Sequence, residues 1–203
     1  MIRPLIDSDL KMAVKIHLSS FPGFFLSFLG PHFLELFYRS FLEDPTGIGF
    51  VATDENGCIL GSVVGPLVPG GYFKRLIKRR WWKFCLASAS PLLRRPWIAL
   101  RLLRALWYCG AAPTGDSVPR ALLSSISVAP EAQGQGVGQA LIKAWLFEVR
   151  RRRGQGAFLT TDAEGNEGVN CFYQRLEWKL ESSYTTAQRR RMNRYIYDFR
   201  EHT

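Results

Sequence analysis

Cysteine is scarce and scattered in this chain. The four cysteines, Cys58, Cys85, Cys109 and Cys171, include no C-x-x-C pair, which excludes a zinc ribbon of that spacing and gives no disulfide framework. No run of about twenty residues is apolar and free enough of charge to span a bilayer. The first residues lack the basic leader and uninterrupted apolar run of an export signal. We therefore expect a cytoplasmic protein without a metal site.

Acidic residues are absent from the segment 66–115, which contains ten Lys and Arg residues. The net charge of +10 is therefore confined to this segment, because the seventeen basic residues elsewhere balance the seventeen acidic ones. Nucleic-acid partners are disfavoured, since leucine and tryptophan, rather than polar residues, separate these cations.

The composition is that of a folded globular chain, with 47% hydrophobic and 13% aromatic residues over 203 positions. We predict one domain over 1–203. The residue patterns predict a mixed α/β sheet protein. The expected strands cover 1–6, a hairpin at 48–65, 121–130, 156–163, 178–186 and 190–199; the expected helices cover 7–18, 31–44, 72–88, 92–108, about 139–153 and 167–176.

Three glycines at every second position, Gly134, Gly136 and Gly138, stand between a predicted strand and a predicted helix. The first turn of a helix presents unpaired N–H groups and partial positive charge, so it attracts anions, and glycines let a phosphate approach the backbone. A Walker A loop needs Lys and Ser or Thr after its last glycine, where this chain has Gln139 and Ala140. The dinucleotide fingerprint needs a different glycine spacing. The pattern that fits is Gln133-x-x-Gly136-x-Gly138.

The stretch "ISVAPEAQGQGVGQALI", residues 126–142, resembles the coenzyme A signature of the GNAT superfamily of acyl-coenzyme A N-acyltransferases. This resemblance implies a GNAT-like fold with a basic helical insertion at about 66–118, between the third and fourth strands. It also implies that coenzyme A lies along the strand and the loop. The implied contacts are Ile126, Ser127 and Val128 for the pantetheine arm and Gln133, Gly134, Gln135, Gly136, Val137, Gly138 and Gln139 for the pyrophosphate.

A second stretch, "EGNEGVNCFYQRLEWKL", resembles the next element of that family, Asn-x-x-Ala-x-x-Phe-Tyr-x-x-x-Gly-Phe. Asn166, Phe172 and Tyr173 match it, and the resemblance adds Asn166 and Phe172 to the coenzyme A contacts. Glu177 stands where the family has glycine, although most residues avoid the left-handed backbone that glycine permits.

Acyl transfer from a thioester to an amine needs a proton donor for the leaving thiolate, a donor to the charged carbonyl oxygen, and a proton acceptor for the amine. By resemblance, Tyr173 is the proton donor and the Val128 N–H is the oxygen's partner. The residues leave the proton acceptor open between Asp162, at the end of a predicted strand, and water held by Ser124 or Ser125. His17 and His32 are the other groups that titrate near neutrality, although a lone histidine in such a stretch is more often structural than catalytic.

The acceptor is expected over the first helices, where Phe24, Phe25 and Phe28 are candidates for its pocket and fit a hydrophobic core equally well. The basic insertion fits three roles: a positively charged lid over an anionic acceptor, a peripheral membrane contact, or a contact between two copies in a homodimer.

These observations predict an acetyl-CoA-dependent N-acetyltransferase that acts on the primary amine of a small molecule, such as an amino sugar or its nucleotide-linked form. A protein or peptide N-acetyltransferase, and an inactive acyl-CoA-binding module at a membrane surface, remain the alternatives.

Overall fold

The computed structural model describes residues 1–22, 25–87, 119–186 and 189–202. In chain order the elements are β1 (Ile2–Pro4), η1 (Asp7–Asp9), α1 (Leu10–Ser20), α2 (Phe25–Phe28), α3 (Pro31–Glu43), β2 (Gly47–Thr53), β3 (Ile59–Pro66), α4 (Pro69–Ala87), β4 (Ala121–Leu122), β5 (Ser125–Val128), η2 (Pro130–Ala132), α7 (Val137–Arg151), β6 (Gly156–Asp162), α8 (Glu167–Arg175), β7 (Lys179–Thr185), β8 (Arg191–Asp198) and η3 (Phe199–His202).

These strands form two four-stranded sheets. The first has the order β1-β2-β3-β5 and is antiparallel. The second has the order β4-β6-β8-β7, in which only β4 and β6 run parallel. The predicted mixed α/β class is thereby confirmed, although the strands are divided between two sheets rather than joined in one.

The strand expected over 121–130 is interrupted at Leu123 and Ser124, which corrects the prediction of a continuous strand. The Leu123 N–H donates to the Phe158 carbonyl at 3.0 Å, whereas the Ser124 N–H donates to the Val64 carbonyl at 3.0 Å. The chain therefore exchanges one partner strand for another between two successive residues. As a result, β4 remains with β6 while β5 joins β3, and the two sheets separate beyond this point.

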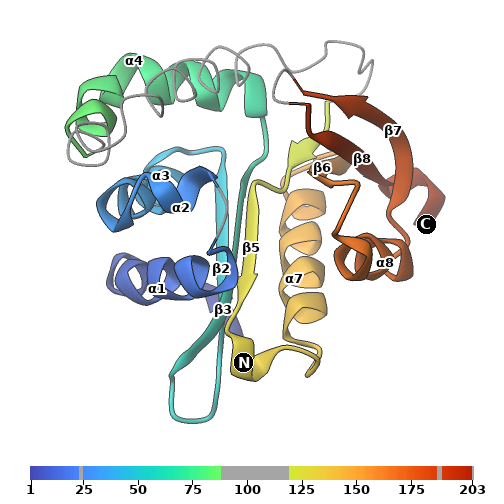
Figure 1. The fold of residues 1–203 in the computed structure, drawn as a ribbon, viewed down its shortest axis with the longest axis horizontal. Helices are drawn as coiled ribbons and strands as arrows, with labels where there is room; N and C mark the ends of the chain where they lie inside the picture. The colour runs from blue at the N-terminus through green and yellow to red at the C-terminus, as the bar shows by residue number, and fades with distance from the viewer. Residues whose placement is uncertain (23–24, 88–118, 187–188, 203) are drawn as a thin grey trace.

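Helices cover both faces of the first sheet (Figure 1). On one face, α1, α3 and α4 enclose a core of apolar side chains that includes Leu34, Phe37 and Phe41 from α3. This helix buries those residues because they recur at the three-to-four-residue spacing of a helix face. On the other face, α7 packs Leu141 and Trp145 against the sheet. Both faces of β5 are therefore enclosed, and its polar side chains need protein partners.

The predicted basic insertion is described in part. Its first expected helix, over 72–88, is present as α4, which packs on α3 through the buried Tyr72. Its second expected helix, over 92–108, lies outside the described residues, so the extent of the insertion and of the single domain stays a prediction. None of the helices within the described ranges has the length and apolarity needed to cross a membrane.

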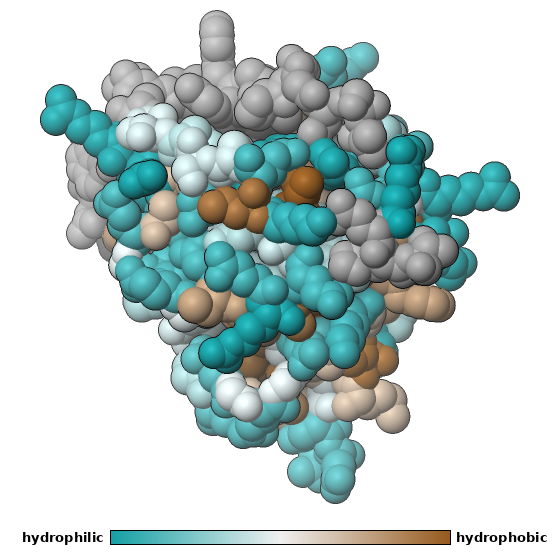
Figure 2. All heavy atoms as spheres, turned by 90° about the vertical axis from the view of Figure 1, so that its right-hand side faces the viewer, coloured by the Kyte–Doolittle hydropathy of each residue, from teal (hydrophilic) through white to brown (hydrophobic). Residues whose placement is uncertain are grey.

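The side of the molecule that carries α8 and β7 is largely hydrophilic (Figure 2). Every residue of β7 is exposed, although β8 beside it buries Arg194 and Tyr195. The edge strand β7 therefore meets solvent, whereas Tyr195 of β8 belongs to the core that β8 shares with α7 and β6.

Candidate active site

A cleft of about 990 Å³ lies where β5 and β6 separate. Its walls come from β5, the glycine loop, the start of α7, the end of β6 and α8. The chain changes its partner strand at Leu123 and Ser124, and beyond this point no strand of the described residues pairs with β5 or β6 on the sides that face each other. The cleft is thus a direct product of the broken strand.

The cleft edge of β5 offers free backbone groups to a ligand. The Ala129 N–H donates to the Leu60 carbonyl at 2.8 Å, and the register pairs Ser127 with Ser62. Because hydrogen-bonded residues alternate along an antiparallel ladder, the N–H groups of Ile126 and Val128 point away from β3, toward the open edge. An extended, amide-rich molecule can pair with this edge as an added strand.

The glycine loop leads this edge into the start of α7. Gly134 and Gly136 have φ of 76° and 80°, and a Cβ added at either position would meet nothing within 4 Å. Gly136 is the residue before the helix, whose first intrahelical bond runs from the Ala140 N–H to the Gly136 carbonyl at 3.0 Å. The N–H groups from Val137 to Gln139 precede this first bond and have no intrahelical partners, which suits a phosphate.

Helix α8 closes the opposite side of the cleft. Asn166, directly before this helix, donates through Nδ2 to the Thr161 hydroxyl at 2.8 Å and so fixes its start on β6. Phe172 lies against the glycine loop, because a Cβ at Gly138 would stand 3.3 Å from its ring. Two residues that the sequence assigned to the ligand thus also hold the cleft together.

Tyr173 is the only phenol among the described residues that line the cleft. It is 5% exposed, its ring packs against Trp178 and Tyr195, and its hydroxyl has no hydrogen-bond partner among the described residues. Burial raises the pKa of Tyr173, so the phenol stays protonated at neutral pH. The hydroxyl can therefore donate a proton to a ligand in the cleft.

The turn after α8 keeps its form although glycine is replaced there. Glu177 has a φ of 65°, in the left-handed region. The Glu177 N–H donates to the Gln174 carbonyl at 3.0 Å, and the Trp178 N–H donates to the Tyr173 carbonyl at 3.1 Å. This is the Schellman pattern of a helix end, and it anchors the backbone of Tyr173.

The carboxylate of Asp162 lines the cleft but has a strong partner. Arg190 donates to it from Nη2 at 2.6 and 2.8 Å and from Nε at 3.1 Å. A bidentate guanidinium occupies the carboxylate lone pairs that a proton acceptor must offer. The position of Asp162 fits the predicted role of proton acceptor, but its ion pair with Arg190 competes with that role.

The structure also places the other predicted contacts. Eleven of the twelve predicted coenzyme A contacts line the cleft, together with Tyr173 and Asp162. Ten of these contacts lie on β5, the glycine loop, α7 and α8: Ile126, Ser127, Val128, Gln133, Gly134, Gly136, Val137, Gly138, Gln139 and Phe172. Asn166 is the eleventh. Gln135 does not line the cleft, since its side chain turns back to the Glu131 carbonyl at 2.9 Å.

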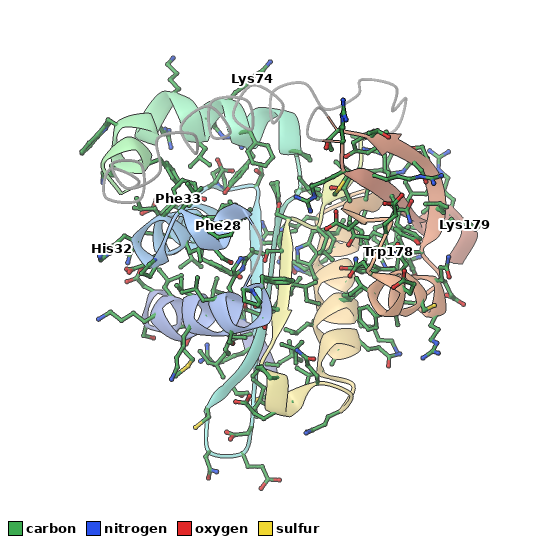
Figure 3. The ribbon with its side chains drawn as sticks, in the orientation of Figure 1. Phe28, His32, Phe33, Lys74, Trp178 and Lys179 are labelled. Atoms are coloured by element: carbon green, nitrogen blue, oxygen red, sulfur yellow. The ribbon has the colours of Figure 1, made fainter. Side chains whose placement is uncertain are left out.

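The predicted acceptor residues are placed less favourably. Phe28 is 37% exposed and is not among the cleft residues; Figure 3 shows it beside α2 and α3, far from Trp178 at α8. Phe24 lies outside the described residues, and of Phe25 only the backbone, which begins α2, is described. Among the described side chains of this segment, the aromatic one that lines the cleft is Phe21, joined by Leu26 and His17. Phe21 stands in the same aromatic run as Phe24, Phe25 and Phe28, but it was not among the residues predicted for the acceptor pocket.

The sequence model of the acetyltransferase (GNAT) family matches residues 11–178. The chain belongs to the GNAT acetyltransferase family. As a GNAT acetyltransferase it is an acyltransferase that uses acetyl-CoA as the acyl donor and an amine as the acceptor. A search of curated proteins found no match.

Solved structures share the fold of this GNAT acetyltransferase at low sequence identity. A ribosomal-protein-alanine N-acetyltransferase from Brucella melitensis is 15% identical, with a TM-score of 0.64 over 98% of this chain and 99% of that one. A variant of spermidine N-acetyltransferase from Vibrio cholerae is 14% identical, with a TM-score of 0.61 over 98% of this chain and 94% of that one. The two act on a protein and on a small molecule, so the shared fold leaves the acceptor undecided.

The residues of this GNAT acetyltransferase fit coenzyme A. The open edge of β5 suits the amides of the pantetheine arm, and the space at Gly134 and Gly136 beside the start of α7 suits the pyrophosphate. The described residues contain no group of three or more His, Cys, Asp or Glu side chains placed to hold a metal ion.

Proposed function

We propose that this GNAT acetyltransferase transfers the acetyl group of acetyl-CoA to the primary amine of a small molecule whose remainder is neutral or anionic. The observation that carries the proposal is the continuity of the cleft. The side chain of Tyr173, the open edge of β5 and the N–H groups at the start of α7 all line this one cleft. A thioester held along this edge has its sulfur end inside the cleft and its charged end at the helix.

Tyr173 acts as the proton donor in this proposal. Its phenol is protonated, buried and free of other hydrogen bonds among the described residues, so it can deliver a proton to the sulfur that leaves. The Val128 N–H, at the open edge, is the proposed donor to the carbonyl oxygen as it gains charge.

The charges of the cleft support the choice of acceptor. Asp162 is the one acidic side chain among its described lining residues, and it is paired with Arg190, while Arg175 adds a further cation. A polyamine would find no free carboxylate in this lining. A nucleotide-linked amino sugar has both the amine and the negative charge that such a site favours.

The test is release of free thiol from acetyl-CoA with four acceptors: a nucleotide-linked amino sugar, the free amino sugar, spermidine, and a peptide with an N-terminal alanine. We expect the fastest turnover with the nucleotide-linked sugar. Tyr173→Phe should lower kcat about 100-fold and leave acetyl-CoA affinity, measured by calorimetry, unchanged. Turnover with the peptide alone would overturn the acceptor class, and an unaffected Phe variant would overturn the role of Tyr173.

A further inference from the structure

A buried polar cluster lies behind β5, on the side opposite α7. His17 of α1, Tyr38 of α3 and Ser125 of β5 meet there, and all three are at least nine-tenths buried. The Nδ1 atom of His17 is 3.1 Å from the Tyr38 hydroxyl and 3.3 Å from the Ser125 hydroxyl, and the two hydroxyls are 3.4 Å apart. Residues 108 positions apart in the chain thus form one hydrogen-bonded group.

The cluster reaches the cleft at two of its members. His17 and Ser125 are both cleft residues, whereas Tyr38 is fully enclosed. The contacts of the His17 ring are the two hydroxyls at Nδ1 and the rings of Phe21 and Tyr38. The Nε2 atom of His17 therefore has no hydrogen-bond partner among the described residues. One nitrogen of the ring is therefore fixed by protein and the other is left for a ligand.

We propose that His17 accepts the proton of the attacking amine through Nε2, and that Tyr38 and Ser125 are positioning residues that hold its Nδ1–H. The inference rests on the acetyl transfer proposed above and assigns the proton acceptor to His17 rather than to Asp162. In this step the amine nitrogen forms a bond to the carbonyl carbon of the thioester. The carbon–sulfur bond breaks, and the electron pair of that bond goes to sulfur. The nitrogen proton passes to Nε2, the Tyr173 proton passes to sulfur, and water restores both residues.

Three properties of the cluster suit this role. Burial lowers the pKa of His17 to about 4, so the ring is neutral at pH 7 and one nitrogen has a free lone pair. The recorded contacts of His17 include no charged side chain among the described residues, so no carboxylate holds it in the protonated form. A proton acceptor is needed only while the new bond forms, because the attacking nitrogen then becomes a much stronger acid than a free ammonium ion.

The hydroxyl chain also sets the tautomer. Tyr38 can accept from Nδ1–H and donate onward, because the hydroxyls of Ser125, Ser62 and Ser127 surround it and the last two are 3.2 Å apart. Burial raises the pKa of Tyr38, which keeps the phenol neutral. With the proton on Nδ1, the free lone pair of this cleft residue is on Nε2.

The tautomer can be read without any substrate. The chain has three histidines, so spectra of ¹⁵N-histidine-labelled protein are simple, and His17→Asn assigns the signal of His17. At pH 7 in the presence of coenzyme A we expect Nδ1 to carry the proton and Nε2 to be bare. A signal from a protonated Nε2 would overturn the proposal.

Kinetics supply the second measurement, with the acceptor that gives the fastest turnover among the four above. His17→Asn keeps an N–H donor toward the two hydroxyls but removes the ring acceptor. We expect kcat to fall about 100-fold with acetyl-CoA affinity unchanged, whereas His32→Asn, at an exposed position of α3, should match the unmodified enzyme. A kcat within about threefold of the unmodified enzyme would contradict the assignment.

Tyr38→Phe is a second test, for use if His17→Asn no longer binds acetyl-CoA because it has lost its fold. It should populate the Nε2–H tautomer and lower kcat about fivefold without changing acetyl-CoA affinity. An unchanged tautomer and kcat would overturn the positioning role and the proposal with it. If none of the four amines is acetylated, the proposed function fails, while the tautomer alone still decides the state of His17.

Discussion

Asn170 of α8 accepts a hydrogen bond from the Tyr195 hydroxyl at 2.9 Å, and Tyr195 is 1% exposed on β8. The same amide accepts from Asn193 at 3.0 Å and donates to the Asp162 carbonyl at 2.9 Å. One side chain thereby joins α8, β6 and β8, three residues before Tyr173. Its replacement by Leu, of similar size, should lower the free energy of unfolding by about 2–3 kcal/mol, because the buried Tyr195 hydroxyl loses its acceptor.

Urea unfolding measures this loss. Asn56→Leu, at an exposed position of the turn between β2 and β3, is the matched control and should change the stability by less than about 0.5 kcal/mol. Equal effects at the two positions would show that the Asn170 hydrogen bonds do not hold α8 in place.

Gly136 can be separated from an ordinary turn glycine by comparison with Gly57. Their φ values are 80° and 81°, and neither has an atom within 4 Å of an added Cβ. Ala at either position should cost about 1 kcal/mol of stability, because an L-residue is strained in this conformation. Only Gly136→Ala should also weaken acetyl-CoA binding, about tenfold or more in calorimetry, since its methyl group enters the proposed phosphate cradle. Equal affinities of the two variants would contradict the cradle.

The left-handed Glu177 leads to a stabilising substitution. Gly at this position relieves the strain of a φ of 65° at the end of α8, and we expect a gain of about 0.5–1 kcal/mol in the free energy of unfolding. Glu164→Gly is the control, because Glu164 is exposed and has no positive φ, so added chain freedom alone should destabilise it. A loss of stability in Glu177→Gly would show that contacts of the Glu side chain outweigh the strain.

The sequence predicted the parts of the site that depend on local pattern. The glycines at 134, 136 and 138 and the helix after them are encoded within a few residues, as is the helix that carries Phe172 and Tyr173. Each of these elements was found where it was expected. The left-handed backbone at Glu177 was also retained, because the two hydrogen bonds of the helix end do not require glycine.

The rest depends on partners that are distant in the chain. The segment "LLSSIS" has a uniform strand pattern, and only the exchange of Phe158 for Val64 as partner shows that it breaks at Ser124. The Arg190 that pairs with Asp162 is 28 positions away, and the Ser125 beside His17 is 108 positions away. Periodicity within a helix or strand carries no information on such pairs, so the sequence alone could not choose between Asp162 and His17.

Asp162→Asn tests that choice from the other side. Asn keeps one oxygen that can accept from Arg190, but it cannot take up a proton. If Asp162 only pairs with Arg190 and has no part in proton transfer, the enzyme should tolerate this substitution. We expect kcat to fall less than about fivefold, against about 100-fold for His17→Asn. A large loss in the Asp162 variant together with full activity of the His17 variant would restore Asp162 as the proton acceptor.

The ion pair between α3 and α4 should make stability depend on acid pH. Arg75 donates to Asp44 at 2.7 and 2.8 Å, and these hydrogen bonds lower the pKa of Asp44 from its ordinary 3.8 to about 2. A depressed carboxyl pKa stabilises the fold above the ordinary value, and this contribution is lost as the pH falls from about 4 to about 2.

Asp44→Asn should therefore cost about 1–2 kcal/mol at pH 7, and the difference from the unmodified protein should shrink to near zero at about pH 2. Urea unfolding from pH 7 to pH 2 measures it. Asp7→Asn, which removes a carboxylate that is 66% exposed beside Arg39, is the control and should cost less than about 0.5 kcal/mol at pH 7. A deficit that stays constant to pH 2 would mean that Asp44 stabilises the α3–α4 junction through its hydrogen bonds to Thr46, which Asn also disturbs, rather than through its charge.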